Sequence, residues 1–289
     1  MKDFKNFFAD LGLLYSAAIW GSTFFMVKSA LEFISPLALI GYRFLIASVF
    51  MYILLRFMKR PVFKNFKNGI MLGVILWFVY FPQTLGLKYT TASNSGFITG
   101  LFIVFVPFMG WMLFRKLPAL NKILSVFIAL SGLWILTGGM NNINRGDVLT
   151  LITALAYALH ILFAGKYMGS GSDPFVLTFQ QFFVVGVLSI ISALPFSVSL
   201  SWTQGHVWWT IAFLAVFPTL SAFLIQMISQ KFTSPVKVAL IFSMEPVFAA
   251  IFAWTLGGEL FVLRRGIGGL IIVSAILISE LPVLNINKK

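Results

Sequence analysis

One carboxylate, Glu245, lies in the middle of a long apolar run, and a proline follows it directly. The run reads VALIFSMEPVFAAIFAWTLGG and holds no other charged residue. A charge deep in a bilayer is costly, and proline removes a helical hydrogen bond at the same point. Because desolvation favours the neutral form of a carboxylate, Glu245 is a candidate for binding a proton or a substrate ammonium group. The alternative is structural: Glu245 caps backbone groups freed near Pro246, or pairs with another helix.

Two other ionisable residues, Arg43 and His160, also fall inside apolar runs. Arg43 keeps its proton, so it needs a cage of carbonyls, a carboxylate or an anionic substrate. His160 could relay a proton because the ordinary pKa of histidine lies close to neutral, or it could simply bond to a neighbouring helix. The candidates for coupling are therefore Glu245 and His160. Spacing alone does not establish whether Arg43 and Glu245 meet.

Uncharged polar side chains and one tryptophan complete the set that could line a pore. Trp20 adjoins Gly21, Ser22 and Thr23, small residues that let a helix or a ligand approach closely. Trp202, Trp208 and Trp209 lie at the end of a run and are expected to be interfacial anchors. Most buried polar groups bond between helices, and a minority should line the pore. The predicted substrate-binding residues are Trp20, Arg43, Tyr80, Gln83, Asn94, Ser95, Tyr157, His160, Gln226 and Glu245.

Enzymatic and metal-binding signatures are missing from the sequence. There is no phosphate-binding G-x-x-x-x-G-K-[ST] loop, no G-x-S-x-G elbow and no H-E-x-x-H helix. The two histidines are 46 positions apart, which makes a poor metal site. We therefore expect no catalytic residue, no metal and no cofactor. An intramembrane enzyme or a scaffold stays as a remote alternative.

The composition is that of a membrane protein. Of 289 residues, 60% are hydrophobic and only 10% are charged, against about 25% in a soluble domain. The formal charge of +13 could suggest a nucleic-acid partner, but the basic residues occupy short connections between apolar runs. In that position they indicate orientation and contact with anionic lipid at the cytoplasmic face, so no nucleic-acid binding is expected.

Ten segments are long and apolar enough to cross a bilayer as helices. The first is longer than a signal-peptide core and begins a regular series, so we interpret it as a span. The predicted spans are 11–31, 36–57, 68–88, 92–114, 121–140, 147–168, 174–195, 206–228, 233–257 and 262–284.

The distribution of Lys and Arg predicts the orientation of these spans. With the N-terminus inside, 15 basic residues lie at inner ends and 5 at outer ends, with Arg43 within a span. Both termini are therefore predicted to be cytoplasmic. The inner set is Lys2, Lys5, Arg56, Lys59, Arg60, Lys64, Lys67, Arg115, Lys116, Lys122, Lys166, Lys231, Lys237, Lys288 and Lys289, and the outer set is Lys28, Lys88, Arg145, Arg264 and Arg265.

The chain also repeats itself. Residues 88–117 resemble 231–260: both begin Lys-aromatic-Thr, continue through an apolar helix with a proline, and form the fourth span of a five-span half. Because five is odd, the halves cross the membrane in opposite senses, as in many secondary transporters. We predict an all-α polytopic membrane protein, with ten transmembrane helices as two inverted five-helix repeats, residues 1–140 and 141–289, around a central cavity.

Six segments, in order along both halves, resemble the EamA-type ten-helix proteins of the drug/metabolite transporter superfamily. They are AAIWGSTFFMVKSAL (17–31), YRFLIAS (42–48), YTTASNSGFITGLFIVFVPF (89–108), GDVLTLITALAYALHI (146–161), QMISQKFTSPVKVALIFSMEPVFAAIFAWTLGGEL (226–260) and RGIGGLIIVSAILIS (265–279). The resemblance implies that spans 1–4 and 6–9 surround the cavity, with spans 5 and 10 outside them. It also implies a transporter of small molecules. One departure is that Val106 precedes Pro107 where Glu245 precedes Pro246, so the carboxylate is not duplicated.

The functional prediction follows from the repeats and the midspan ionisable residues. We expect a secondary active transporter in the cytoplasmic (inner) membrane of a prokaryote, working by alternating access. Export of small metabolites, amino acids or drugs is the leading hypothesis, driven by protons or by the substrate gradient. The alternative is an importer or exchanger of the same fold. The expected partners are a small-molecule substrate and the lipid bilayer, with the chain a monomer or a homodimer.

Overall fold

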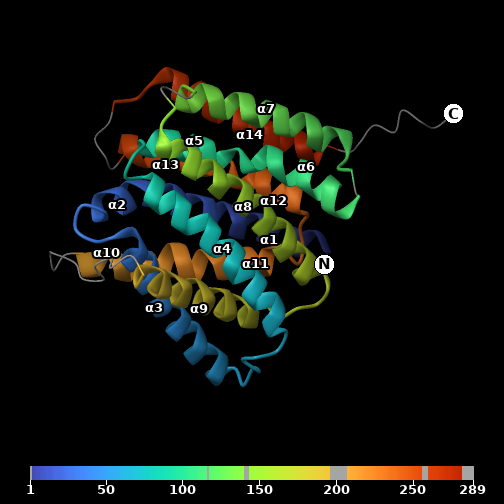
Figure 1. Ribbon diagram of the computed structural model, residues 1–289. Coiled ribbons are helices and arrows are strands. Elements are labelled where there is room, and N and C mark those ends of the chain that lie inside the picture. The colour runs from blue at the N-terminus through green and yellow to red at the C-terminus, as the bar shows by residue number, and fades with distance from the viewer. Residues whose placement is uncertain (1, 116, 140–142, 196–206, 256–259, 282–289) are drawn as a thin grey trace.

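The computed structural model of the chain describes residues 2–115, 117–139, 143–195, 207–255 and 260–281. Every regular element in these ranges is a helix (Figure 1). Lys116, Trp202, Asn287, Lys288 and Lys289 lie outside the described residues. The helices are α1 (Lys2–Gly21), α2 (Thr23–Ala30), α3 (Pro36–Phe57), α4 (Phe66–Gly86), α5 (Ala92–Gly100), α6 (Phe102–Phe114), α7 (Leu120–Thr137), α8 (Arg145–Gly169), α9 (Pro174–Ala193), α10 (Val207–Leu214), the π-helix η1 (Ala215–Ser221), α11 (Ala222–Ser229), α12 (Pro235–Phe242), α13 (Glu245–Thr255) and α14 (Leu263–Glu280).

The helices reproduce the predicted spans closely. Nine segments of the described chain are long and apolar enough to cross a membrane. The first begins at Phe4, earlier than the predicted position 11, because the helix continues through the polar residues at its start. The others begin and end within a few residues of the prediction. The protein is an all-α, multi-pass membrane protein.

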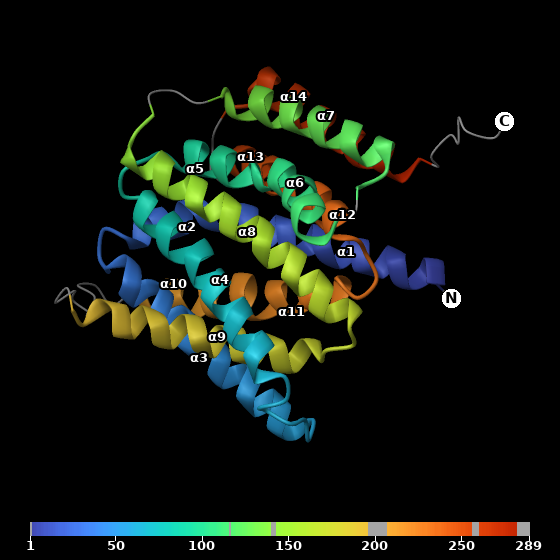
Figure 2. The same cartoon turned by 45° about the vertical axis from the view of Figure 1, so that its right-hand side comes forward.

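The tenth span is α14, whose 18 residues include the charged Arg264, Arg265 and Glu280. It lies antiparallel along the whole of α7 (Figure 2). The Asn121 amide, at the start of α7, donates at 3.0 Å to the carbonyl of Ser279, in the last turn of α14, and at 2.9 Å to that of Leu281, just beyond its end. Near the middle of α7, Gly132 meets Gly268 so closely that a Cβ on Gly132 would lie 2.8 Å from the Gly268 carbonyl oxygen. Since α14 is as long as α7 and packs along it, we expect α14 to cross the membrane beside α7.

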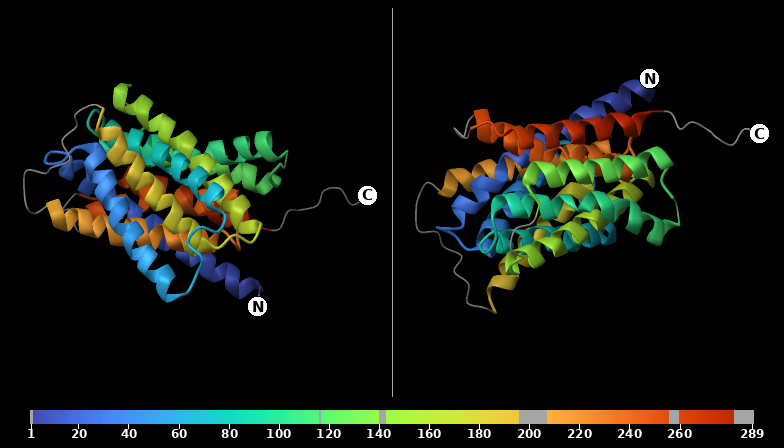
Figure 3. Two further views of the ribbon diagram at one scale, coloured as in Figure 1. Left: turned by 60° about the horizontal axis from the view of Figure 1, so that its bottom comes forward. Right: turned by 90° about the horizontal axis from the view of Figure 1, so that it is seen from above.

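The helix pairing has a regular pattern. The pair α7–α14 forms one edge of the bundle and α3–α9 lies at the other, with α1, α4, α8 and α12 between (Figures 1 and 3). The first span contacts the eighth and ninth through α11 and α13, and the sixth span, α8, contacts the third and fourth through α4, α5 and α6. If spans 1–5 are exchanged with spans 6–10 in order, each of these contacts is replaced by another that is also present. Two related five-helix halves would give such a pattern, and the division at residue 140 stays a prediction.

Four spans are interrupted near the middle of the bundle. The first breaks at Ser22, between α1 and α2, and the eighth contains η1 around Pro218. The fourth breaks at Leu101, between α5 and α6, and the ninth breaks just before Glu245, between α12 and α13. Irregular backbone at this depth is tolerated only inside a protein or beside a water-filled cavity. The breaks therefore indicate positions that lie inside the bundle or beside a cavity, away from lipid.

A charged cluster ties the start of α12 to the end of α14 and to Asp10, two turns into α1, on the face predicted to be cytoplasmic. Lys237 Nζ lies 2.8 Å from Asp10 Oδ2 and 3.0 Å from Glu280 Oε2, which joins α12 to α1 and α14. On the same predicted face, Arg60 Nη1 contacts Asp173 Oδ2 at 2.5 Å, between the segments that follow α3 and precede α9. Partly exposed ion pairs contribute little stability each, but they mark helix ends that are closed against one another.

The predicted topology can be tested by cysteine labelling, because the chain has no native cysteine. Two exposed loop side chains make a matched pair: Ile143, before α8, and Phe63, between α3 and α4, are 73% and 74% exposed. A membrane-impermeant maleimide is expected to label Ile143→Cys in intact cells and Phe63→Cys only after permeabilisation. Labelling in the opposite order would reverse the orientation derived from the basic residues.

Candidate functional site

A cavity lies among the interrupted helices, between the first, second, third, fourth, sixth, eighth and ninth spans. Its free volume is about 50 Å³, room for a few water molecules, so a metabolite can enter only if the walls move apart. Val27 and Leu87, near the ends of α2 and α4, line one end, so the cavity extends toward the face predicted to be outside. Its lining residues are Trp20, Thr23, Phe24, Val27, Arg43, Val79, Tyr80, Gln83, Thr84, Leu87, Thr99, Tyr157, Phe223 and Glu245.

Glu245 lines this cavity from the first residue of α13. It is 8% exposed, and neither an ion pair nor a hydrogen bond to its side chain occurs among the described residues. The last turn of α12 before it is tightened, because the Ser243 and Met244 amides donate to the carbonyls three residues back, those of Leu240 and Ile241, at 3.2 and 3.0 Å. The helix break thus places an unpaired carboxylate at the cavity wall.

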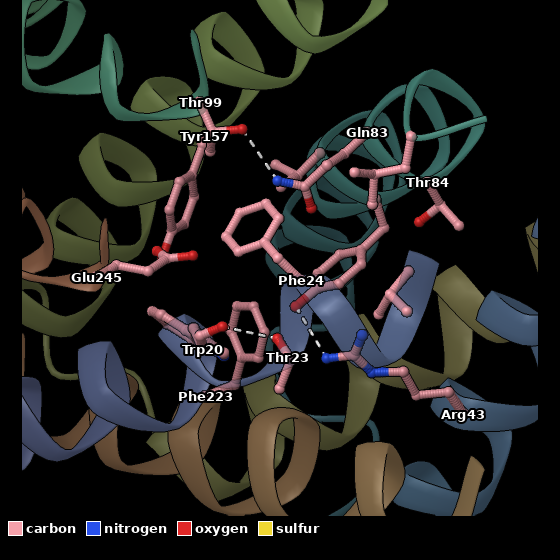
Figure 4. Close-up of a pocket in the computed structure, with 14 residues that line it drawn as sticks. Trp20, Thr23, Phe24, Arg43, Gln83, Thr84, Thr99, Tyr157, Phe223 and Glu245 are labelled. Carbon is pink, nitrogen blue, oxygen red and sulfur yellow. Dashed lines mark hydrogen bonds between the residues drawn. The ribbon is translucent and has the colours of Figure 1, made fainter. Parts of the chain in front are cut away.

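Arg43, on α3, lines the opposite side of the cavity from Glu245 (Figure 4). Its Nε donates to Thr219 Oγ1, and its Nη2 donates to the Tyr80 hydroxyl at 3.3 Å. Thr219 belongs to η1, where its hydroxyl also donates to the Leu214 carbonyl at 2.7 Å. The π-helix therefore turns Thr219 toward Arg43. The two charged side chains face one cavity without forming an ion pair with each other.

Trp20, near the end of α1, closes the cavity on the side toward the face predicted to be cytoplasmic. Its indole N–H donates to the Pro218 carbonyl in η1 at 2.7 Å. Its ring packs on Phe223 and Phe242 with centroids 5.0 and 4.9 Å apart, and on Tyr157 at 6.1 Å. We call Trp20, Tyr157, Phe223 and Phe242 the aromatic floor. Below the aromatic floor, on the side away from the cavity and toward the face predicted to be cytoplasmic, apolar side chains such as Leu13, Ile161 and Leu240 are fully buried.

Six of the ten predicted residues line the cavity: Trp20, Arg43, Tyr80, Gln83, Tyr157 and Glu245. The Gln83 amide donates to Thr99 Oγ1 at 3.0 Å, which joins α4 to α5. Sequence reasoning missed the other lining residues, which are apolar or threonine and resemble ordinary helix residues. Only Thr23 had a signal in the sequence, because it belongs to the run of small residues, Gly21 to Thr23, that follows Trp20. The missed residues are Thr23, Phe24, Val27, Val79, Thr84, Leu87, Thr99 and Phe223.

The other four predicted residues do not reach this cavity. His160 is fully buried with its Nε2 2.8 Å from Gln181 Oε1, and its ring packs against Phe223 below the aromatic floor. Gln226 lies about one turn after Phe223 on α11 and is also fully buried. Asn94 lies in the first turn of α5, and Ser95 next to it is fully buried. Trp20 and Gln83 thus share this cavity, and Asn94 and His160, predicted to line the same pore, lie outside it.

Comparison with known proteins places the chain in a family. The profile of the EamA-like transporter family matches residues 7–138 and again residues 144–281. The chain belongs to the EamA-like transporter family. This membership confirms the resemblance seen in the sequence and establishes the protein as a membrane transporter.

The relatives of this EamA-like transporter are named as transporters too. An uncharacterized transporter of Archaeoglobus fulgidus is 35% identical over 283 residues, covering 96% of this chain and 88% of the relative. The uncharacterized inner membrane transporter YedA of Escherichia coli is 24% identical, covering 89% and 85%. A crystal structure of a protein with 16% sequence identity superposes with a TM-score of 0.81 and covers 96% of this chain and 98% of its own. That likeness shows that the two chains share one overall fold.

Proposed function

We propose that this EamA-like transporter is a secondary exporter of small metabolites, amino acids or drugs, with Glu245 as the group that binds a proton or a substrate cation. The observation that carries the proposal is the unpaired, 8% exposed carboxylate at the wall of the central cavity. A buried charge without a partner is unfavourable, so binding a proton or a cation stabilises the site. The other titratable side chains that line the same cavity are Arg43, Tyr80 and Tyr157.

Alternating access is supported by the difference between the side of the bundle predicted to face outside and the side predicted to face the cytoplasm. The cavity extends from Glu245 toward the predicted outer face, while the aromatic floor and the Asp10–Lys237–Glu280 cluster close the other side. We therefore interpret this conformation as outward-facing, in a cytoplasmic membrane with both termini inside. To open inward, the aromatic floor has to separate and the Lys237 contacts have to break. Four interrupted spans supply hinges for this change.

Proton-driven export predicts the direction of flux in reconstituted liposomes. Vesicles loaded with pooled radiolabelled amino acids, purines or cationic dyes should release substrate faster when the outside is made acidic, because inward proton movement drives outward substrate movement. The controls are protein-free vesicles and vesicles whose pH gradient has been collapsed with a protonophore. Substrate uptake together with protons would instead identify an importer, and flux that needs substrate on both sides would identify an exchanger. No flux of any pool would refute the proposed export of these substrate classes.

A further inference from the structure

The cavity contains one carboxylate and one guanidinium, and both are unneutralised. Glu245 and Arg43 come from α13 and α3, on opposite sides of the labelled group in Figure 4, with Thr23 and Phe24 between them in that view. Among the described residues, no ion pair involves either side chain. They are 8% and 4% exposed. When Glu245 is ionised, its charge and that of Arg43 cancel in sum but stand at opposite sides of the cavity.

Arg43 is held in position without losing its capacity to bind an anion. A guanidinium has five N–H donors. One Nε–H goes to Thr219 and one Nη2–H goes to Tyr80, which leaves three donors. Both partners are uncharged hydroxyls, so the positive charge remains. The planar fork of arginine suits bidentate binding of a carboxylate, and the Tyr80 ring, 4.8 Å from the guanidinium carbon, keeps the fork in place.

Glu245 offers the complementary group. Its side chain has no hydrogen-bond donor among the described residues, so both carboxylate oxygens are available to a ligand. The neighbouring cavity residues Trp20 and Tyr157 present aromatic rings, which attract an ammonium group and exclude water from it. A primary ammonium group at this end of the cavity therefore meets the Glu245 carboxylate beside two aromatic residues.

We propose that the cavity selects zwitterions, with the substrate ammonium group on Glu245 and the substrate carboxylate on Arg43. This inference rests on the proposed transport function and names the substrate class of the same site. A ligand with both charges compensates both buried groups at once. An amine leaves Arg43 uncompensated and an acid leaves Glu245 uncompensated, and a buried charge without a partner is strongly unfavourable. The apolar lining from Phe24, Val27 and Phe223 suits an uncharged side chain on the zwitterion.

Equilibrium binding to the detergent-purified chain, without a gradient, tests the substrate class. The twenty standard amino acids, 4-aminobutanoate and 5-aminopentanoate are screened by the shift in thermal midpoint. The best binder is then compared with its decarboxylated amine and its deaminated acid by calorimetry. At least one zwitterion is expected to bind about 10- to 100-fold more tightly than both analogues, the range for losing one charge-assisted contact. If no zwitterion in the set binds, or if one analogue binds as tightly as its zwitterion, the proposal is wrong.

Two variants assign the charges to the two ends. Arg43→Gln should lower the affinity for the zwitterion and leave the affinity for the amine unchanged. Glu245→Gln should lower the affinity for the zwitterion and leave the affinity for the acid unchanged. The controls are Arg56→Gln, an exposed arginine of the same helix α3, and Glu32→Gln, an exposed glutamate. The ratio of affinities for zwitterion and amine is read within one variant, so partial unfolding cancels. Arg43→Lys, which retains the positive charge, should keep part of the preference. An unchanged ratio in Arg43→Gln would remove Arg43 from recognition.

The outcomes separate this inference from the proposed function. Binding without a zwitterion preference, together with gradient-driven flux in liposomes, would overturn the substrate class and leave export standing. Zwitterion binding with no flux under any gradient would support the site and refute transport of that ligand by this chain.

Discussion

Glu245→Gln is expected to abolish proton-driven transport while the protein still folds and reaches the membrane. Glutamine keeps the shape of the side chain at the start of α13 but neither carries a negative charge nor exchanges a proton. A hydrogen bond to a charged group contributes about 1.5–3 kcal/mol, so the rate of gradient-driven efflux should fall by roughly 10- to 100-fold or more. The measurement is efflux from liposomes with and without a pH gradient, normalised to reconstituted protein.

Glu32→Gln is the control for this experiment, because Glu32 is exposed in the connection after α2, away from the cavity lining. It should transport like the wild type. Substrate exchange at equal concentrations, without a gradient, separates the two roles of Glu245. Retained exchange with lost proton drive would show coupling alone, and loss of both would show substrate binding as well. Wild-type rates and pH dependence in Glu245→Gln would reduce Glu245 to a structural residue.

Gly21→Ala is expected to lower both stability and transport, because no room exists for a methyl group where α1 meets α13. A Cβ on Gly21 would lie 2.5 Å from the Glu245 carbonyl oxygen and 3.0 Å from the Ala249 amide nitrogen. Both atoms belong to the backbone and cannot rotate away. Overpacking of this kind costs about 1–3 kcal/mol, and it shifts the residue that bears the carboxylate. We expect a lower thermal midpoint and a reduced efflux rate.

Gly96→Ala is a matched control, because it is also a helical glycine and a Cβ there would have no atom within 4 Å. Both substitutions gain about the same helix propensity, so the difference between them reports packing. The midpoint of Gly96→Ala should equal or exceed that of the wild type. Equal midpoints and equal efflux rates in the two variants would contradict the close approach of α1 and α13.

The helices could be predicted from the sequence because hydropathy is a local property. A run of about 20 apolar residues needs a membrane whatever surrounds it, so the span at 36–57 matches α3 and the span at 174–195 nearly matches α9. The breaks are a different matter. The fourth and ninth spans break twelve residues after Tyr89 and Phe232, at Leu101 and Met244, although their prolines stand eighteen and fourteen residues after the same positions. Proline alone does not locate the break.

The sequence by itself determined the membrane class, the ten spans, the family resemblance and the rarity of Glu245, Arg43 and His160 as charged or titratable residues within spans. Only the tertiary structure decided which of these face a common space. Arg43 is held by Thr219, 176 residues away, and His160 by Gln181 below the aromatic floor. All three residues look alike in the sequence, as polar groups in apolar helices. What separates them is how the helices rotate and where they break, and that depends on contacts between distant segments such as Trp20 on Pro218.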